Sequence, residues 1–350
     1  MRVALDATPL VAETGGVPRY VRELRGALDG LGGGDTFEYV TDQAVPGALG
    51  PRGGWLERKW WLAGLPMLLR REGFDVFHGT EFAVPYVPVC ASVLSLHDLS
   101  PWMDARWHGP GVERVRRRTP WLLRMGLATM VLTLSEAVRR QAIAKFGLDP
   151  ARVVAVPLAA SAALRPLAPP EPGTPYFLYV GTLEPRKNLP MLVEAWRAVR
   201  TRHRVRLVLA GRRREDGPSF VSGDGLEVLG RVEERHLAAL YAGALAVVYP
   251  THYEGFGLPV VEAMQCGAPV VTSRDESVVE VAGGAAAHCD ANRPEEWVEV
   301  LQALIENPAM RADLRAHGLA RAAEFTWERT ARETLAVYRQ AERLYSGQRL

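Results

Sequence analysis

The 350-residue sequence has few cysteines, no long apolar run and almost no net charge. Cys90, Cys266 and Cys289 are widely spaced and form no C-x-x-C pair, so neither a disulfide framework nor a zinc site is expected. No segment of about 18 apolar residues occurs, so we expect no transmembrane helix. The net charge of +2 is too small to indicate a nucleic-acid-binding protein. Asp6 stands where a signal peptide would have its apolar centre, so we expect a cytoplasmic protein.

A dinucleotide-binding glycine pattern is also missing. Residues 3–7 form a short run that is apolar apart from Asp6, and residues 17–28 have helical spacing, which predicts a strand, a loop and a helix. The loop ends in Gly15 and Gly16 and lacks G-x-G-x-x-G, which argues against a nicotinamide enzyme. The two glycines either let a ligand reach the helix start or form only a flexible turn.

The sequence contains 48% hydrophobic and 23% charged residues, which is typical of a globular protein, and its length favours two domains. Alternating strand and helix patterns predict an N-terminal domain at residues 1–165 and a C-terminal domain at residues 176–330. The proline-rich residues 166–175 predict a linker. A final helix at residues 331–350 could return to the N-terminal domain. The expected fold class is α/β, with two tandem Rossmann-like domains whose parallel sheets face each other across a cleft.

The most informative stretch is Tyr249–Gly267, which reads Y-P-T-H-Y-E-G-F-G-L-P-V-V-E-A-M-Q-C-G. A strand predicted at residues 246–249 leads through a glycine-rich bend into a helix predicted at residues 259–266. Gly255 and Gly257 would let the backbone approach a ligand, and the helix N-terminus offers unpaired N–H groups. Such a turn can bind a phosphate.

Two carboxylates, Glu254 and Glu262, flank this turn. They could hold hydroxyl groups beside the phosphate, and a sugar nucleotide carries both kinds of group. The alternative is an ordinary strand–loop–helix unit whose glutamates are first-turn helix residues.

Polar side chains follow two other predicted strands. Arg186 and Lys187 could bind a diphosphate, the arginine through its two-pronged guanidinium and the lysine as a point charge. The alternative is a solvated turn with two surface charges. His97 ends a strand of the first domain, and Asp98 could fix its tautomer. Because carboxyl ends of parallel strands share one sheet edge, these groups can act together.

Four motifs carry a resemblance to a known family: Y-E-G-F-G-L-P-V-V-E-A-M, V-G-T-L-E-P-R-K-N-L, S-L-H-D-L-S-P and T-G-G-V-P-R-Y. The chain resembles the family-four retaining glycosyltransferases of the GT-B fold over nearly its whole length. It is similar to the bacterial mannosyltransferase-like branch that assembles O-antigen and exopolysaccharide.

This resemblance implies transfer of a hexosyl residue, expected to be mannosyl from GDP-mannose, to a glycan or lipid-linked acceptor. It also implies that residues 1–165 form the acceptor-side domain and residues 176–330 the nucleotide-sugar donor domain. It implies no metal and no organic cofactor. Glucosyl or rhamnosyl transfer, a sugar-nucleotide epimerase and a non-catalytic nucleotide-sugar-binding module remain alternatives.

The resemblance also implies residue roles. Glu254 would contact hydroxyls of the donor sugar, and Glu262 would take the ribose hydroxyls. Lys187 and Arg186 would neutralise the leaving diphosphate, and His97 would lie near the transferred sugar. Further contacts to the donor are expected from glycine-rich turns and helix starts, namely Gly15, Gly16, Gly181, Thr182, Gly255, Phe256, Gly257 and Leu258.

Two segments of the first domain, residues 55–71 and 102–124, mix tryptophan, leucine and basic residues. They could lie on an anionic membrane, where a lipid-linked acceptor would be found. The alternative is two helices whose tryptophans and leucines face the core and whose arginines are solvated.

Overall fold

The computed structural model of the chain describes residues 1–12, 15–51, 54–167 and 173–347, and these form two compact units. Unit 1 comprises Met1–Met103, Pro110–Leu158 and Trp327–Leu350, and unit 2 comprises Asp104–Gly109 and Ala159–Thr326. Part of the predicted linker, residues 168–172, lies outside the described residues. Each unit is α/β with a parallel sheet, which confirms the predicted α/β class with two tandem Rossmann-like domains.

Within its described residues, unit 1 contains a six-stranded sheet in the order β2-β1-β3-β4-β5-β6, and every pairing is parallel. The strands are β1 (Arg2–Asp6), β2 (Thr36–Val40), β3 (Val76–Gly79), β4 (Ala91–Leu96), β5 (Met130–Thr133) and β6 (Val153–Ala155). β1 pairs with β2 on one side and with β3 on the other. The strand order therefore reverses between β1 and β3, where ligands bind in open α/β sheets.

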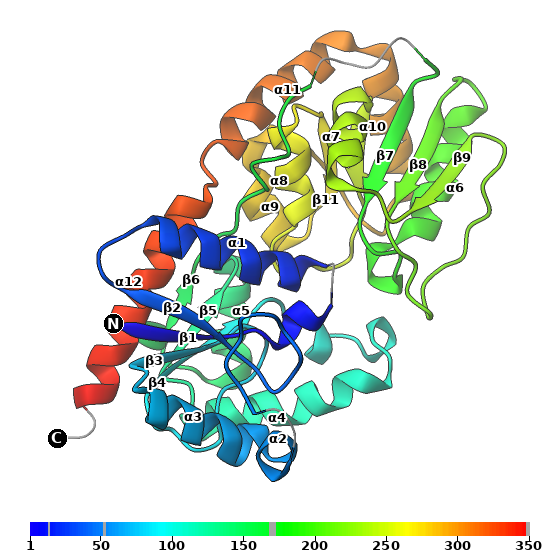
Figure 1. Cartoon of the computed structure of the whole chain (residues 1–350). Coiled ribbons are helices and arrows are strands. Elements are labelled where there is room, and N and C mark those ends of the chain that lie inside the picture. The colour runs from blue at the N-terminus through cyan, green and yellow to red at the C-terminus, as the bar shows by residue number, and fades with distance from the viewer. Residues whose placement is uncertain (13–14, 52–53, 168–172, 348–350) are drawn as a thin grey trace. The chain divides into compact units, whose positions relative to one another are not determined.

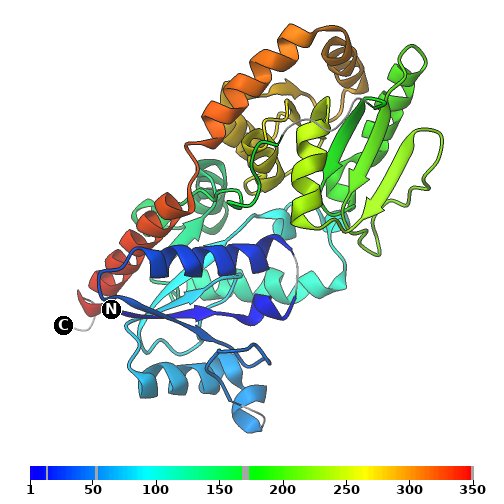
Figure 2. The same cartoon turned by 45° about the horizontal axis from the view of Figure 1, so that its top comes forward.

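Helices flank this sheet, α1 on one side and α2 and α3 on the other (Figures 1 and 2). The helices are α1 (Gly16–Gly30), α2 (Trp55–Arg58), α3 (Leu65–Glu72), α4 (Glu113–Arg124), α5 (Glu136–Phe146) and α12 (Trp327–Gly347). A π-helical turn at Trp60–Gly64 joins α2 to α3, and 3₁₀ turns lie at Thr8–Val11, Ser100–Trp102, Ala105–Trp107, Pro110–Val112 and Pro150–Arg152. The segment 102–124 is therefore α-helical only from Glu113 onward.

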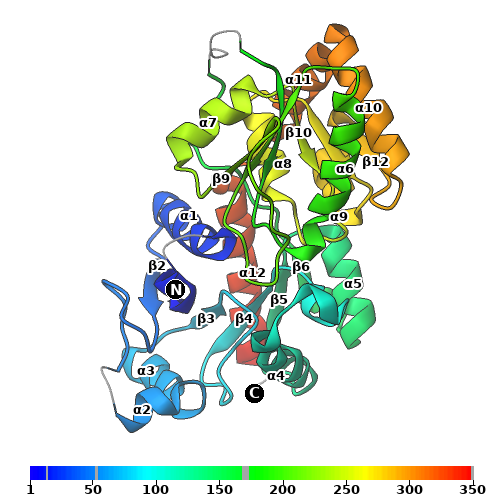
Figure 3. The same cartoon turned by 90° about the vertical axis from the view of Figure 1, so that its right-hand side faces the viewer.

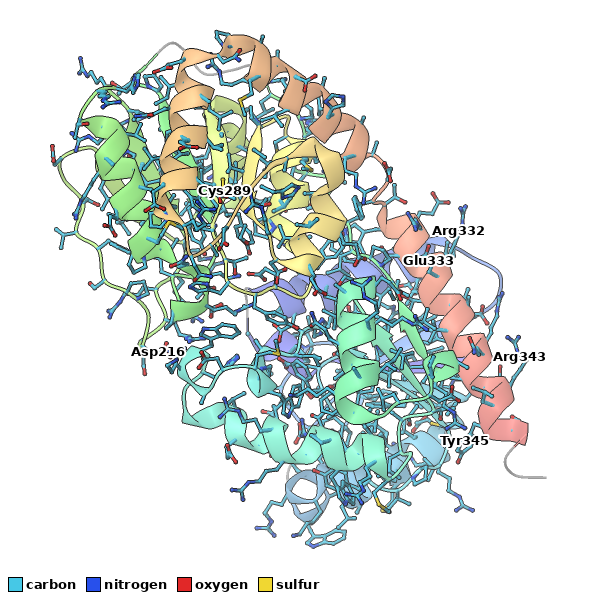
Figure 4. The ribbon with its side chains drawn as sticks, turned by 180° about the vertical axis from the view of Figure 1, so that it is seen from behind. Asp216, Cys289, Arg332, Glu333, Arg343 and Tyr345 are labelled. Atoms are coloured by element: carbon cyan, nitrogen blue, oxygen red, sulfur yellow. The ribbon has the colours of Figure 1, made fainter. Side chains whose placement is uncertain are left out.

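The C-terminal helix α12 belongs to unit 1, where it packs against α1 and strands β3, β4 and β5. Its inner side buries Leu335 and Tyr338, and the Tyr338 hydroxyl lies 2.6 Å from Nδ1 of His78 in β3. Its outer side carries Arg332 and Arg343, which point away from the ribbon (Figure 4). This amphipathic pattern explains why the helix covers the sheet.

Unit 2 has, among its described residues, a second six-stranded parallel sheet in the order β12-β11-β10-β7-β8-β9. The strands are β7 (Tyr176–Val180), β8 (Arg206–Ala210), β9 (Leu226–Gly230), β10 (Ala246–Tyr249), β11 (Val270–Ser273) and β12 (Ala287–Cys289). β7 pairs with both β8 and β10, so the strand order of this sheet reverses between β7 and β10. Ligands of such sheets bind at this reversal.

The helices of unit 2 cover both faces of its sheet, with α6 and α10 on one face and α7 and α8 on the other (Figure 3). They are α6 (Leu189–Arg200), α7 (Glu234–Gly243), α8 (Leu258–Gln265), α9 (Glu276–Ala282), α10 (Pro294–Glu306) and α11 (Pro308–Ala322), with 3₁₀ turns at Pro185–Lys187 and Gly283–Ala285. The sequence did not predict α9 or β12. Among the described residues of both units, no helix is sufficiently long and apolar to cross a bilayer.

Candidate active site

Polar side chains gather in unit 2 where β7 and β10 end. Arg186 and Lys187 form the 3₁₀ turn that follows β7, and Glu254 lies in the loop between β10 and α8. Because β7 and β10 are parallel neighbours, both loops emerge at the same sheet edge. The structure therefore brings together three residues that the sequence predicted as a site.

Glu254 is 8% exposed and is bonded through both carboxylate oxygens. Its Oε1 accepts hydrogen bonds from Lys187 Nζ, from Thr251 Oγ1 at 3.0 Å and from the Tyr249 hydroxyl at 3.1 Å. Its Oε2 accepts from Arg186 at 3.3 Å. Lys187 Nζ also lies 2.9 Å from the Tyr249 hydroxyl, so this tyrosine links the two charged groups.

The electrostatics of this cluster keep Glu254 ionised. Burial alone would raise the pKa of the carboxyl, but the charges of Arg186 and Lys187 outweigh it and lower the pKa to about 2. Burial lowers the pKa of Lys187, and the nearby Glu254 partly offsets that effect. A carboxylate and two cations are thus held together away from water.

The cluster extends to residues that sequence analysis missed. Glu184 is 2.8 Å from Arg186 and 2.7 Å from Arg214, which belongs to the loop after β8. Among the described residues, Arg214 also pairs with Asp216 at 2.5 Å, so this network contains three cations and three carboxylates. Its charges balance, and an anionic ligand would have to replace a carboxylate as the partner of a cation.

The turn after β7 requires glycine at position 181. Gly181 has φ of +147°, and a Cβ there would lie 2.8 Å from the Tyr179 hydroxyl. That hydroxyl donates to the carbonyl oxygen of Thr182 at 3.0 Å. Gly181 and Thr182 thus shape the backbone that precedes the two cations, and their predicted contact with a donor stays a prediction.

The turn before α8 has the predicted geometry of a helix start. Gly257 caps α8 in the left-handed region with φ of +88°, and the helix begins at Leu258, one residue before the predicted start. Phe256 is buried and lies edge-on to Phe325, with ring centroids 5.8 Å apart. Gly255 and Gly257 therefore bring a helix N-terminus next to the loop that carries Glu254, while Phe256 anchors that loop.

Glu262 lies one turn into α8 and is 3% exposed. Its Oε2 accepts a hydrogen bond of 2.9 Å from the Tyr241 hydroxyl in α7. The described bonds thus hold Glu254 between two cations and Glu262 against a neutral tyrosine. The two glutamates occupy different environments, as expected for different roles.

In unit 1, His97 follows β4 and is held by a backbone oxygen. Its Nε2 lies 2.6 Å from the carbonyl oxygen of Thr80, so that nitrogen carries the hydrogen. The Thr80 carbonyl thus sets the tautomer, while Oδ1 of Asp98 accepts from the amide of Ser100 at 2.9 Å, and the predicted role of Asp98 stays a prediction. Burial lowers the pKa of His97, which favours a neutral ring with a free lone pair on Nδ1.

The start of α1 leaves room for a ligand atom. Gly15 caps the helix with φ of +133°, a conformation that favours glycine. A Cβ on Gly16 would meet no atom of the described residues within 4 Å. The geometry allows a phosphate at this turn, and the role of Gly15 and Gly16 stays a prediction.

The fold resembles that of solved glycosyltransferase structures. Sucrose-phosphate synthase from Thermosynechococcus elongatus aligns with a TM-score of 0.76 at 20% identity, over 97% of this chain and 98% of that chain. Two doubly wound parallel sheets in one chain, with polar residues at the strand reversals, define the GT-B class of glycosyltransferases.

The sequence comparisons then assign the family. Residues 164–321 match the model for glycosyl transferases group 1, and residues 14–161 match the model for glycosyltransferase family 4. O-antigen chain mannosyltransferase B of Escherichia coli is 34% identical over 285 residues, covering 75% of this chain and 74% of that protein. D-inositol 3-phosphate glycosyltransferase of Kineococcus radiotolerans is 31% identical, covering 61% of this chain and 58% of that protein. The chain belongs to the group 1, family 4 glycosyltransferases, which confirms the resemblance in the sequence.

Proposed function

We propose that this glycosyltransferase moves a mannosyl residue from GDP-mannose to a growing glycan or lipid-linked glycan, with retention at the anomeric carbon. The observation that carries the proposal is the buried cluster of Arg186, Lys187 and Glu254 at the strand reversal of unit 2. The choice of mannose is supported by the identity with O-antigen chain mannosyltransferase B of Escherichia coli.

The cluster supports binding of a nucleotide diphosphate sugar by exchange of partners. Lys187 and Arg186 both donate hydrogen bonds to Glu254. An arriving diphosphate offers these cations stronger anionic partners. Glu254 would then be released to accept hydrogen bonds from sugar hydroxyls, while Glu262 would accept those from the ribose.

The proposed chemistry breaks one bond and forms one. The bond between the anomeric carbon and the diphosphate oxygen breaks, and the acceptor oxygen bonds to the anomeric carbon on the same face. The acceptor proton passes to the departing phosphate oxygen. Arg186, Lys187 and the N-terminus of α8 would stabilise the negative charge that develops there, so the proposal needs no metal and no organic cofactor. His97 would lie near the transferred sugar.

We also propose that unit 1 binds an anionic membrane through α2, α3 and α4. Trp55 and Trp121 are 56% and 47% exposed, and Met67 and Met125 are also exposed. Exposed basic residues accompany them, namely Arg58, Lys59, Arg70, Arg71, Arg114, Arg117 and Arg124. The two segments adjoin, because the Arg118 guanidinium of α4 lies 5.4 Å from the Trp61 ring centroid. Apolar and basic side chains on one surface favour an anionic bilayer.

Substitutions in the cluster test the catalytic proposal. Glu254→Gln keeps the size of the side chain and its contacts with Tyr249 and Thr251, and Lys187→Ala removes one cation. We expect each to lower kcat for mannosyl transfer from GDP-mannose by about 100-fold or more, because a charged group that stabilises the transition state is lost.

The matched controls are Glu299→Ala and Lys145→Ala, since both side chains are exposed on helices outside the cluster. Their rates should equal that of the unchanged protein. Lys187→Ala also leaves a buried carboxylate with one fewer partner, so its unfolding must be measured in parallel. Normal transfer rates in folded Glu254→Gln and Lys187→Ala would contradict the proposed site.

A further inference from the structure

Unit 2 contains a cavity of about 420 Å³ whose described lining is Thr174 and residues 200–206. Thr174 precedes β7, and residues 201–205 lie between α6 and β8, so the cavity is at the amino ends of these two parallel strands. Arg186 and Lys187 follow the carboxyl end of β7, before the other end of α6. Since the 12 residues of α6 span about 18 Å, the cavity is separate from the donor cluster. Its volume lies within the range of small-molecule sites, about 300–1,000 Å³.

The charge of this cavity has one sign. Its described lining contains four arginines and no carboxylate, namely Arg200, Arg202, Arg204 and Arg206. A hollow lined by one sign of charge concentrates counter-ions, because the surrounding low-dielectric protein focuses the field. The cavity is therefore suited to an anion.

Two of the four arginines already have acidic partners. Arg200 is 2.9 Å from Asp224, and Arg206 is 2.9 Å from the Glu227 carboxylate. Both acids lie outside the described lining.

The other two arginines, Arg202 and Arg204, are exposed and form no ion pair with a described residue. Two positive charges thus remain without a partner. A phosphate monoester carries about −1.5 to −2 near pH 7, which matches them. His203 adds no net positive charge, because its Nε2 lies 3.1 Å from the carboxylate of Glu306 in α10.

The paired arginines form a fixed frame around the cavity. The Arg200 guanidinium lies 5.1 Å from the Trp196 ring centroid, and that of Arg206 lies 5.2 Å from the Tyr176 ring centroid. Trp196 Nε1 also donates to the Val205 carbonyl at 3.2 Å, which ties the loop to α6. A frame that is ordered in advance lowers the entropic cost of binding a ligand.

The carboxyl end of α6 would by itself repel an anion, but its last carbonyl groups are bonded. The Ala198 oxygen accepts from the Thr201 amide at 3.3 Å and from the Thr201 hydroxyl at 2.8 Å. The Val199 oxygen accepts from the amides of Arg202 and His203, each at 3.1 Å. These bonds direct the negative end of the helix towards its own loop.

The backbone adds donors to the cavity. The amides of Arg204 and Val205 donate to no acceptor among the described residues, and both residues belong to the lining. Arginine forks together with backbone N–H groups are the donors by which proteins hold phosphate oxygens.

We propose that this cavity binds a phosphate monoester, with Arg202 and Arg204 donating to its oxygens and with Arg200 and Arg206 as the fixed walls. This inference goes beyond the proposed function and does not depend on it, because the cavity lies at the other end of α6 from the donor cluster. The same chemical group occurs on small phosphorylated solutes and on the headgroup of phosphatidic acid.

The first test titrates the full chain with glycerol 3-phosphate at physiological salt, by calorimetry. Arg202→Ser with Arg204→Ser should weaken binding by about 100-fold or more, since a hydrogen bond to a charged group contributes about tenfold or more. Both side chains are exposed, so this variant should fold normally. The matched control is Arg235→Ser with Arg293→Ser, because both arginines are exposed in unit 2 and lie outside the described lining. It should bind as tightly as the unchanged protein.

Lys187→Ala separates this cavity from the donor cluster. Its affinity for glycerol 3-phosphate should equal that of the unchanged protein, whatever its effect on transfer. Binding that is lost in folded Lys187→Ala and kept in Arg202→Ser with Arg204→Ser would place the phosphate in the donor cluster and overturn the inference.

Vesicle flotation identifies the source of the phosphate. Vesicles with phosphatidic acid or with phosphatidylglycerol are matched in zeta potential, so that unspecific attraction is equal. A preference for phosphatidic acid that disappears in Arg202→Ser with Arg204→Ser would identify a lipid headgroup. Glycerol 3-phosphate binding without such a preference would identify a small solute. The absence of both in the unchanged protein would overturn the inference, and so would an unaltered affinity in the variant.

Discussion

Asp6 and Glu254 are both buried acids, yet their environments shift their pKa values in opposite directions. Glu254 lies between Lys187 and Arg186, which lower its pKa to about 2. Burial raises the pKa of Asp6 to about 6, and the nearby charges of Glu81 and Asp42 act in the same direction. The opposite pKa shifts come from the charged groups beside each carboxyl, because both side chains are buried. A buried carboxylate whose surroundings disfavour its ionised form is more useful for binding than for stability.

This difference gives a pH-dependent prediction for Asp6→Asn. The pKa of Asp6 is raised in the folded state, so its stabilising contribution is complete below about pH 4 and is lost as pH rises through about 6. Near pH 7.5 the ionised carboxylate should cost roughly 3 kcal/mol of unfolding free energy. We therefore expect Asp6→Asn to be more stable than the unchanged protein at pH 7.5, with the gain shrinking towards pH 4.

Urea unfolding of both proteins across this pH range measures the difference. Asp29→Asn is a suitable control, because Asp29 is exposed and forms a surface ion pair with Arg25. Its free energy of unfolding should differ from that of the unchanged protein by about 0.5 kcal/mol or less at any pH. A constant difference between Asp6→Asn and the unchanged protein from pH 4 to 8 would show that Asp6 does not titrate as described.

Among the elements, the exposed surface of α2, α3 and α4 gives a prediction about membranes. Arg70→Glu, Arg71→Glu and Arg117→Glu together should abolish binding to vesicles that contain 30% anionic phospholipid. Each basic residue near such a surface contributes about 1 kcal/mol to the free energy of membrane binding, so the affinity for the vesicles should fall by more than about 100-fold. Flotation of the protein with vesicles in a density gradient measures it.

Helix α12 provides the control for that measurement. Arg332 and Arg343 are exposed on its outer side (Figure 4), and they lie in the same unit but on another element. Arg332→Glu with Arg343→Glu should leave flotation unchanged. Failure of the unchanged protein to float with anionic vesicles would end the membrane proposal.

The elements themselves were largely predictable, because their signals are local. Ser135 and Gly147 mark the ends of α5, and the structure shows the expected cap, with the Ser135 hydroxyl accepting from the Val138 amide at 3.2 Å and Gly147 at φ of +63°. The short β12 and α9 were missed because three-residue strands and seven-residue helices carry little periodic signal.

At the scale of the whole molecule, the sequence predicted motifs but not the order of the strands. Strand order depends on pairings between distant segments, and that order decides which loops become neighbours. Arg214 and Thr80 were therefore missed, although each contacts a predicted region. Lys187 and Glu254 were found because glycines and prolines mark their loops.

The two-unit organisation predicts how the donor changes thermal unfolding. Each unit has its own sheet, so scanning calorimetry can resolve two transitions. GDP-mannose at 100 times its Kd should stabilise the unit that binds it by about 2.7 kcal/mol. We expect only the transition of unit 2 to move, and Lys187→Ala should remove the shift.

A panel with UDP, ADP and dTDP sugars in the same instrument identifies the preferred donor. A larger shift with one of these nucleotides would replace GDP-mannose as the proposed donor. No shift with any of the four would contradict the donor site in unit 2.

The position of α12 has a consequence for synthesis of the chain. Its residues, Trp327–Gly347, cover β3, β4 and β5, whose own residues leave the ribosome much earlier. Translation adds about 5–20 residues per second, so α12 is synthesised on the order of ten seconds or more after the strands that it covers. Unit 2 is complete once Thr326 has emerged. Unit 1 is thus the first unit to be synthesised in part and the last to finish folding. Until α12 packs on it, the sheet of unit 1 exposes apolar residues to which a chaperone could bind.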